Sequence, residues 1–280
     1  MESIEKVMEQ LTTHSEHTEV KQSCDISDEE KKEREKTERE CSVFNDLEGS
    51  LSGYNCPKCK NKGVIYKPRF NDYHKYWYPT SIDCDCKKIR AEINRREKSG
   101  LNKLVQKYTF DSYNATQEWQ KTVAKKACDY VRNIRGWFFI GGQVGCGKTH
   151  ICTAIVNALI SRGKAARYMI WADEITKLKQ YSTEPKDYNR LLNELKNAEI
   201  LYIDDFIKAK NPTASDIDNT FKIINHRYNE DLPTIISSEL SISQILHIDE
   251  ALGSRIVEMT GDNALYIAPD SDKNMRNIQK

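Results

Sequence analysis

Short apolar runs and amphipathic stretches alternate along the chain from about residue 101 to its end. The short runs are rich in β-branched and aromatic residues, and the stretches between them are long enough for helices. Strands that alternate with helices are typical of a parallel sheet in an α/β domain. We therefore predict an α/β fold with a parallel sheet, whose strands lie near residues 137–140, 166–171, 200–203, 234–237 and 265–268.

The stretches between these strands carry apolar residues at helical spacing. Residues 149–162 predict a first helix, and Gly163 follows it in a C-cap position. A helix over 187–198, and a later one that includes Ile217 and Tyr228, repeat their apolar residues every three or four positions. We expect these apolar faces to pack against the sheet.

The first hundred residues lack this alternation. Residues 1–49 are polar, and the mixed charges of SDEEKKEREKTERE predict a solvated helix capped by Ser27, a disordered segment, or one that orders on a partner. Residues 50–90, with two cysteine pairs and several aromatic residues, predict a small metal-binding module. The basic stretch that follows predicts a linker over 91–110, and the α/β domain is then expected over 111–280.

Composition and charge exclude some classes of protein. Charged residues make up 30% of the chain and the net charge is +1, which gives no bulk signal for nucleic acid or membrane. The apolar runs are shorter than the ~20 residues of a membrane helix, and MESIEKVMEQ lacks the apolar core of a signal peptide. We predict a cytoplasmic protein with no membrane partner, whose nine cysteines are thiols or metal ligands.

The stretch GGQVGCGKTH, residues 141–150, contains the phosphate-loop pattern GxxxxGK[ST]. Glycines let the backbone wrap around phosphate, and the helix that follows turns its positive end toward the anion. Lys148 can reach the β- and γ-phosphates of ATP, and the Thr149 hydroxyl can ligate Mg²⁺. Cys146 is assigned no catalytic role. The predicted nucleotide contacts are Gly142, Gly145, Cys146, Gly147, Lys148, Thr149 and His150.

Two other predicted strands end in polar residues. ILYIDD places Asp204 and Asp205 after a buried strand, where Asp204 would hold Mg²⁺ and Asp205 would orient or deprotonate water. Glu is usual at the second position, so the shorter Asp205 leaves the rate of hydrolysis open. TIISS ends in Ser238, which we predict to be a polar sensor of the γ-phosphate, with a simple Ser–Glu turn as the alternative. The catalytic candidates from the residues are therefore Lys148, Asp204, Asp205 and Ser238.

The cysteine pairs Cys56–Cys59 and Cys84–Cys86 predict a metal site. Four thiolates satisfy a tetrahedral Zn²⁺ and leave no open position, so the site should be structural. His74, between the pairs, is an alternate ligand. The aromatic cluster Tyr73, Tyr76, Trp77 and Tyr78 could pack the module, form a contact patch or stack on bases.

The motifs GxxxxGKTH, YIDD, PTIISSEL and LGSRIVEM follow in an order that resembles the AAA+ helicase loaders of the DnaC/DnaI type. The order is also similar to that of the related IstB transposition helpers. The resemblance covers roughly residues 101–280 and implies a P-loop AAA+ ATPase. It implies that Arg255 is an arginine finger that acts across a subunit interface, with Arg227 as a lesser interface candidate and Arg276 where a second sensor arginine can stand. It extends loosely to the zinc module, which in DnaI-like loaders contacts the helicase.

The resemblance implies a function in the initiation of DNA replication. An ATP-dependent loader of this type would bind a hexameric replicative DNA helicase, help to deposit it on single-stranded DNA, and self-associate through its AAA+ interface. Two alternatives stay open. One is an IstB-like helper that binds duplex DNA and acts on a transposase, and the other is a nucleotide-dependent adaptor with little hydrolysis.

Overall fold

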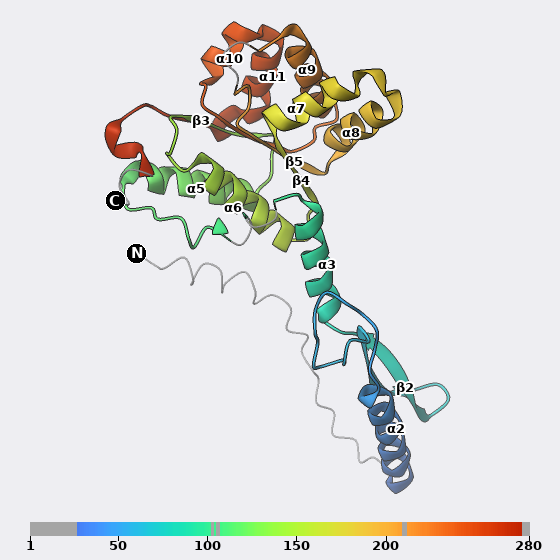
Figure 1. Cartoon of the computed structure of the whole chain (residues 1–280). Helices are drawn as coiled ribbons and strands as arrows, with labels where there is room; N and C mark the ends of the chain where they lie inside the picture. Colours follow the sequence, from blue (N-terminus) through green and yellow to red (C-terminus); the bar gives the residue numbers. More distant parts are fainter. Residues whose placement is uncertain (1–26, 102–103, 105–106, 209–211, 276–280) are drawn as a thin grey trace. The chain divides into compact units, whose positions relative to one another are not determined.

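The computed structural model describes residues 27–101, 104, 107–208 and 212–275. The chain divides into two compact units, Met1–Asp85 and Cys86–Lys280 (Figure 1). Among the described residues, no helix is both long and apolar enough to cross a membrane.

The second unit is built on a five-stranded parallel sheet with the strand order β4-β5-β6-β3-β7. Every position of β3, β5 and β6 is buried, which explains why β3 and β5 begin as continuous apolar runs in the sequence. The predicted α/β fold is confirmed. The strands are β3 (Phe138–Gly142), β4 (Ala166–Ile170), β5 (Ile200–Asp204), β6 (Thr234–Ser238) and β7 (Ala264–Ile267).

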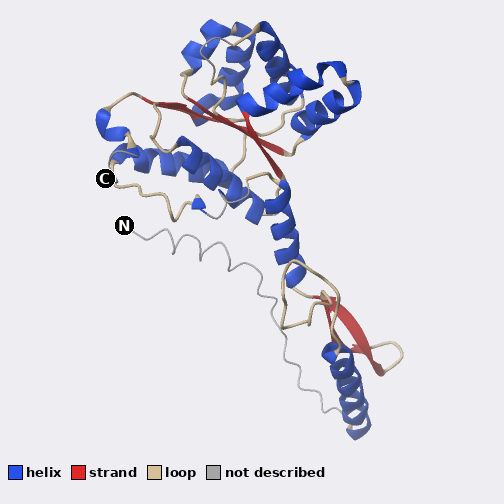
Figure 2. Ribbon diagram, in the orientation of Figure 1, coloured by secondary structure: helices blue, strands red, loops and turns tan. Residues whose placement is uncertain are grey.

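Helices cover both faces of this sheet (Figures 1 and 2). Successive strand residues point to opposite faces, so Phe138 and Ile140 join a core with α5 and α6, whereas Phe139 joins a second core with the helices that follow β4. Gly163, at φ +92°, follows the end of α6 as predicted. The helices of this unit include α3 (Cys86–Lys98), α5 (Glu118–Arg132), α6 (Lys148–Ser161), α7 (Trp171–Gln180), α8 (Pro185–Asn197), α9 (Ala214–Asn229), α10 (Ile242–Ile248) and α11 (Glu250–Thr260), with short 3₁₀ turns at Tyr181–Thr183, Gly261–Asn263 and Ser271–Lys273.

The predicted linker contributes to this second unit. Helix α3 packs on α6 and β4, and the Arg95 guanidinium donates to the carbonyl of Ile160 at 3.3 Å. The Ser99 carbonyl accepts from the amide of Tyr168 at 2.7 Å. The segment between the two predicted domains is therefore held against the sheet.

The described part of the first unit contains helix α2 (Asp28–Asp46), an antiparallel hairpin of β1 (Val64–Asn71) and β2 (Tyr76–Asp83), and the segment between them. Ser27 caps α2 as predicted, and the structure adds a capping box with Glu30. The helix is packed rather than fully solvated, because it buries Thr37 and Cys41. Since α2 has no apolar stripe, it is held by individual polar and aromatic contacts instead.

Three contacts attach α2 to the hairpin. The ring of Phe44 stacks on Tyr66 with 4.8 Å between the centroids. The side-chain amide of Asn45 donates to the backbone carbonyl of Tyr66 at 2.9 Å and accepts from its backbone amide at 2.8 Å. The Arg34 guanidinium lies 5.2 Å from the centre of the Trp77 ring. The contacts of the Tyr66 and Trp77 rings lie on the same face of the hairpin.

Candidate nucleotide-binding site

The glycines of the phosphate loop adopt a backbone that other residues rarely reach. Gly142, Gly145 and Gly147 have φ angles of 138°, 82° and 87°. A Cβ atom on Gly142 would meet the carbonyl oxygen of Ile267 at 2.5 Å. Strand β3 ends at Gly142 and helix α6 begins at Lys148, so the loop lies at the positive end of that helix.

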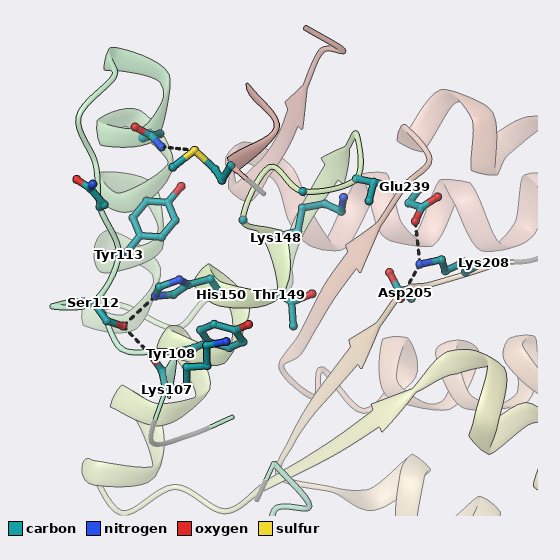
Figure 3. Close-up of a pocket in the computed structure, with 16 residues that line it drawn as sticks. Lys107, Tyr108, Ser112, Tyr113, Lys148, Thr149, His150, Asp205, Lys208 and Glu239 are labelled. Atoms are coloured by element: carbon teal, nitrogen blue, oxygen red, sulfur yellow. Dashed lines mark hydrogen bonds and ion pairs between the residues drawn. The ribbon is translucent and has the colours of Figure 1, made fainter. Parts of the chain in front are cut away.

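Lys148 points back into this loop (Figure 3). It is only 7% exposed, and its Nζ donates to the carbonyls of Gly142 and Gln143, both at 2.7 Å. The Cys146 sulfur lies 3.9 Å from the same Nζ, and burial raises the pKa of this thiol. The lysine therefore has no carboxylate partner in these contacts, and its charge is available to a phosphate group.

Asp204, at the end of β5, accepts hydrogen bonds from three hydroxyl groups. Thr149 donates to its Oδ1 at 3.2 Å, Tyr168 donates to its Oδ2 at 3.0 Å, and Ser237 donates to Oδ1. Burial, together with the charge of Asp204, raises the pKa of the Tyr168 hydroxyl, which keeps it a donor. The structure thus brings together the two predicted Mg²⁺ ligands, Thr149 and Asp204. Hard oxygen donors of this kind suit Mg²⁺.

Asp205 lies at the rim of the same pocket. Its φ is +53°, and its Oδ2 pairs with Lys208 Nζ at 3.0 Å, which also pairs with Glu239 at 2.9 Å. Figure 3 shows these three charged side chains on the opposite side of the pocket from His150. A carboxylate at this position can approach the terminal phosphate of a nucleotide held by Lys148.

Ser238 is placed differently from the expectation. Its hydroxyl is fully buried and donates to the carbonyl of Phe206 at 2.7 Å. The neighbouring hydroxyl, Ser237, is the one that contacts Asp204, and Glu239 lines the pocket. The structure does not bring the Ser238 hydroxyl into the pocket, and its role as a sensor stays a prediction.

Aromatic residues line the other side of the pocket, and the two tyrosines among them were not predicted from the sequence. We call Tyr108, Tyr113 and His150 the aromatic wall. The cavity has a volume of about 480 Å³ and is lined by residues that include Tyr108 and Tyr113. His150 Nε2 lies 3.0 Å from the Thr109 carbonyl, and its ring centre is 4.7 Å from Tyr108 and 5.2 Å from Tyr113. Aromatic rings at this position are suited to packing against a nucleotide base.

The half-buried position of His150 predicts a pH dependence of stability. Burial lowers the pKa of its imidazole, so the unfolded chain binds a proton at higher pH than the folded chain. The stability contribution of neutral His150 is therefore present above about pH 6.5 and is lost as the pH falls below it. We expect the melting temperature of His150→Asn to fall less between about pH 7.5 and about pH 5.5 than that of the unmodified protein. Equal falls in the two proteins would contradict this.

The segment 268–275, which we call the C-terminal strap, holds the phosphate loop from outside. The Gln143 side chain donates to the Asp270 carbonyl at 2.8 Å and accepts from its amide at 2.6 Å. The Met275 amide donates to the Gly145 carbonyl at 3.0 Å. A Cβ atom on Gly145 would meet Asn274 Oδ1 at 2.1 Å, so the Asn274 side chain would have to shift if another residue stood here. Arg276 lies outside the described residues.

Arg255 is not among the residues that line the pocket. It lies on α11, where its guanidinium is 4.9 Å from the Phe221 ring centre and 5.3 Å from that of Tyr228. Its Nε donates to Asn225 Oδ1 at 3.0 Å. Within one chain it therefore cannot complete the site, and a role across an interface stays a prediction.

Arg227 cannot serve at an interface, and that expectation is wrong. The residue is fully buried, and its guanidinium makes five hydrogen bonds, to Thr234 and to the carbonyls of Leu195, Lys196, Ala198 and Pro233. Burial lowers its pKa. Its charge is neutralised by carbonyl dipoles at the end of α8 and the start of β6, so it joins these elements from inside.

The four predicted cysteine ligands lie together. The sulfur atoms of Cys56, Cys59, Cys84 and Cys86 are all within 4.8 Å of one another, and all four residues are buried. The Gly63 amide donates to the Cys59 sulfur at 3.2 Å, as it would to a thiolate. This donor set fits a tetrahedral Zn²⁺. His74, the alternate ligand, is an exposed residue of the hairpin turn and is not part of this group.

Comparison with known proteins identifies the family. The model of the bacterial DnaA ATPase domain matches residues 104–260. The chain belongs to this family of ATP-binding AAA+ proteins. Its curated relatives include the uncharacterized protein YqaM of Bacillus subtilis (strain 168), 26% identical over 287 residues, with 85% of this chain and 90% of the relative covered. The replicative helicase loader DnaC of Escherichia coli (strain K12) is 29% identical over 186 residues, with 64% and 73% covered.

Solved structures of the family have the same fold. A crystal structure of the DnaC helicase loader superposes with a TM-score of 0.51 at 22% identity, over 59% of this chain and 98% of that one. The replication initiator DnaA bound to AMPPCP and single-stranded DNA gives a TM-score of 0.51 at 21% identity, over 61% and 52%. The predicted AAA+ fold and the resemblance to DnaC-type proteins are thus confirmed.

Proposed function

We propose that this protein is an ATP-dependent loader that binds a hexameric replicative helicase and helps to place it on single-stranded DNA. The main support for the proposal is that Thr149 lies within hydrogen-bond distance of Asp204, beside Lys148. The chain is also related to a protein named as a replicative helicase loader. ATP binding would then control assembly with the helicase and release from it.

Each pocket residue has a defined task in this proposal. Lys148 exchanges its two backbone carbonyl partners for the β- and γ-phosphates of ATP, and Thr149 and Asp204 hold Mg²⁺, which supplies charge neutralisation at those phosphates. Asp205 orients the attacking water once its carboxylate is released from Lys208. Because that ion pair occupies Asp205, we expect slow hydrolysis by the isolated chain.

Arg255 is proposed to complete the active site of a neighbouring subunit. A guanidinium supplied from outside would neutralise charge that develops on the γ-phosphate, a contribution worth about 10³-fold or more in related enzymes. We expect Arg255→Ala to bind ATP normally and to lose the stimulation of ATPase activity by helicase or DNA. Arg255→Lys keeps the charge but loses the paired donors of the guanidinium, so it should recover little of this stimulation.

Mixing two inactive variants separates this role from a structural one. Lys148→Ala supplies Arg255, and Arg255→Ala supplies an intact phosphate loop, so equimolar mixtures should regain turnover if Arg255 acts between subunits. Unchanged turnover of Arg255→Ala alone would remove this residue from the active site.

The helicase assignment is tested by affinity capture from the organism that encodes the protein, with and without ATP, followed by mass spectrometry. Recovery of a replicative helicase supports the loader. Recovery of a transposase would instead support the IstB-like alternative. The adaptor alternative is favoured by the Asp205–Lys208 pair, and it predicts helicase capture without measurable ATP turnover.

A further inference from the structure

We propose that the outer face of the β1–β2 hairpin binds single-stranded nucleic acid by stacking its bases on tyrosine rings. The inference concerns the first unit alone. It adds a second DNA contact to the proposed loader and does not depend on the ATP pocket.

The strand register separates the hairpin into two faces. Tyr66 and Trp77 contact Phe44 and Arg34 of α2, so their face is covered by that helix. Residues of opposite parity project from the other side. There Arg69 pairs with Tyr78 and Asn71 pairs with Tyr76. We call this the outer face, with strand positions 65, 67, 69, 71, 76, 78, 80 and 82.

Aromatic rings form a continuous row along the outer face and the turn. Ring centres are 4.7 Å apart for Tyr73 and His74, 6.3 Å for His74 and Tyr76, and 5.7 Å for Tyr76 and Tyr78. Tyr73 is 88% exposed and Tyr76 is 41% exposed. Exposing large rings to water is unfavourable unless a partner covers them, and this row presents several ring faces and edges to one ligand.

The charges beside the rings suit a phosphate backbone. The charged residues at the strand positions of the outer face are Lys67 and Arg69, both basic and both exposed. Asp72 and Lys75 lie in the turn and offset each other. The acidic first turn of α2 belongs to the helix that covers the opposite face. Positive charge next to exposed aromatic rings is the combination that single-strand binding surfaces use.

A single strand fits this surface better than a duplex, because stacking on protein rings requires bases that are not already stacked in a helix. The test uses the full-length protein carrying Lys148→Ala, so that ATP-dependent binding of DNA by the second unit cannot contribute. Fluorescence anisotropy measures the affinity for a labelled oligo-dT and for a duplex of equal length.

Tyr76→Ala should weaken oligo-dT binding about tenfold, and Tyr76→Phe should not, because stacking needs the ring and not the hydroxyl. Tyr54→Ala removes an exposed tyrosine of the same unit outside the row and is the control. Zinc content verifies that each variant is folded. Photocrosslinking to an oligonucleotide with 5-bromouracil should label peptides that contain Tyr73, Tyr76 or Tyr78.

Wild-type affinity in Tyr76→Ala, or crosslinks confined to the second unit, would overturn the proposal. Loss of helicase capture by Tyr76→Ala with normal oligo-dT binding would also overturn the proposal. That result would indicate that the row of rings contacts a protein. Failure of the loader assignment would instead appear as absence of helicase in the capture experiment, with the oligo-dT result unchanged.

Discussion

Replacing Lys148 with alanine is expected to weaken ATP binding by a factor of about 100 or more, because charge-assisted hydrogen bonds contribute roughly 1.5–3 kcal/mol each and this side chain would make them to two phosphates. The lysine is buried beside the loop carbonyls and is aimed at the space where phosphate would lie. The loop backbone also supplies donors to phosphate, but no other side chain of the loop carries a positive charge. Isothermal titration calorimetry with Mg²⁺ and a non-hydrolysable ATP analogue measures the loss.

The matched control is Lys164→Ala. Lys164 lies beyond the other end of α6 and forms a surface ion pair with Glu199 at 2.8 Å, which contributes little to stability or binding. Its affinity for the analogue should equal that of the unmodified protein. If Lys148→Ala bound the analogue equally well, the pocket would not be the nucleotide site.

Cys59→Ser is expected to remove zinc and unfold the first unit while ATP binding survives. Structural Zn²⁺ contributes about 10–16 kcal/mol of apparent binding free energy, which exceeds what a core of this size can supply alone. Serine is a poor zinc ligand, and the remaining three thiols would be left buried and close together. The nucleotide contacts lie in the second unit and do not involve this cluster.

Metal content measures the loss of zinc, and hydrogen exchange measures the folding of each unit separately. Zinc per chain should fall from about one to near zero, and amides of β1 and β2 should lose protection while those of α6 keep it. Cys41→Ser is the control, since Cys41 is buried in the same unit but lies outside the cluster. Retention of zinc by Cys59→Ser would exclude the four-cysteine site.

The sequence predicts the sheet and the phosphate loop well because both have local signals. Strands β3 and β5 are buried on both faces and therefore appear as apolar runs. Asp204 is found from its position directly after such a run. Tyr168 and Ser237 are missed, although both contact Asp204. They are ordinary strand residues, and only the alignment of β4, β5 and β6 brings their hydroxyls to one carboxylate.

Arg227, a candidate for an interface in the sequence, is buried in the structure. Arginine side chains are mostly exposed, and a basic residue in the last turn of a helix such as α9 is favourable for the helix dipole. Its burial is decided by carbonyl groups of Leu195, Lys196 and Ala198, about thirty residues earlier in the chain. The tyrosines of the aromatic wall, at residues 108–113, were missed for a similar reason, since an irregular segment carries no periodic signal.

The C-terminal strap follows the phosphate loop in the sequence and is therefore synthesised after it. Until residues 264–275 leave the ribosome, β3 has an unpaired edge where β7 will bind, and the phosphate loop lacks its partners Asp270 and Met275. An incomplete nascent chain would thus present the whole GxxxxGKT motif without the support that shapes it. Nucleotide binding should therefore mature only after the strap has been translated.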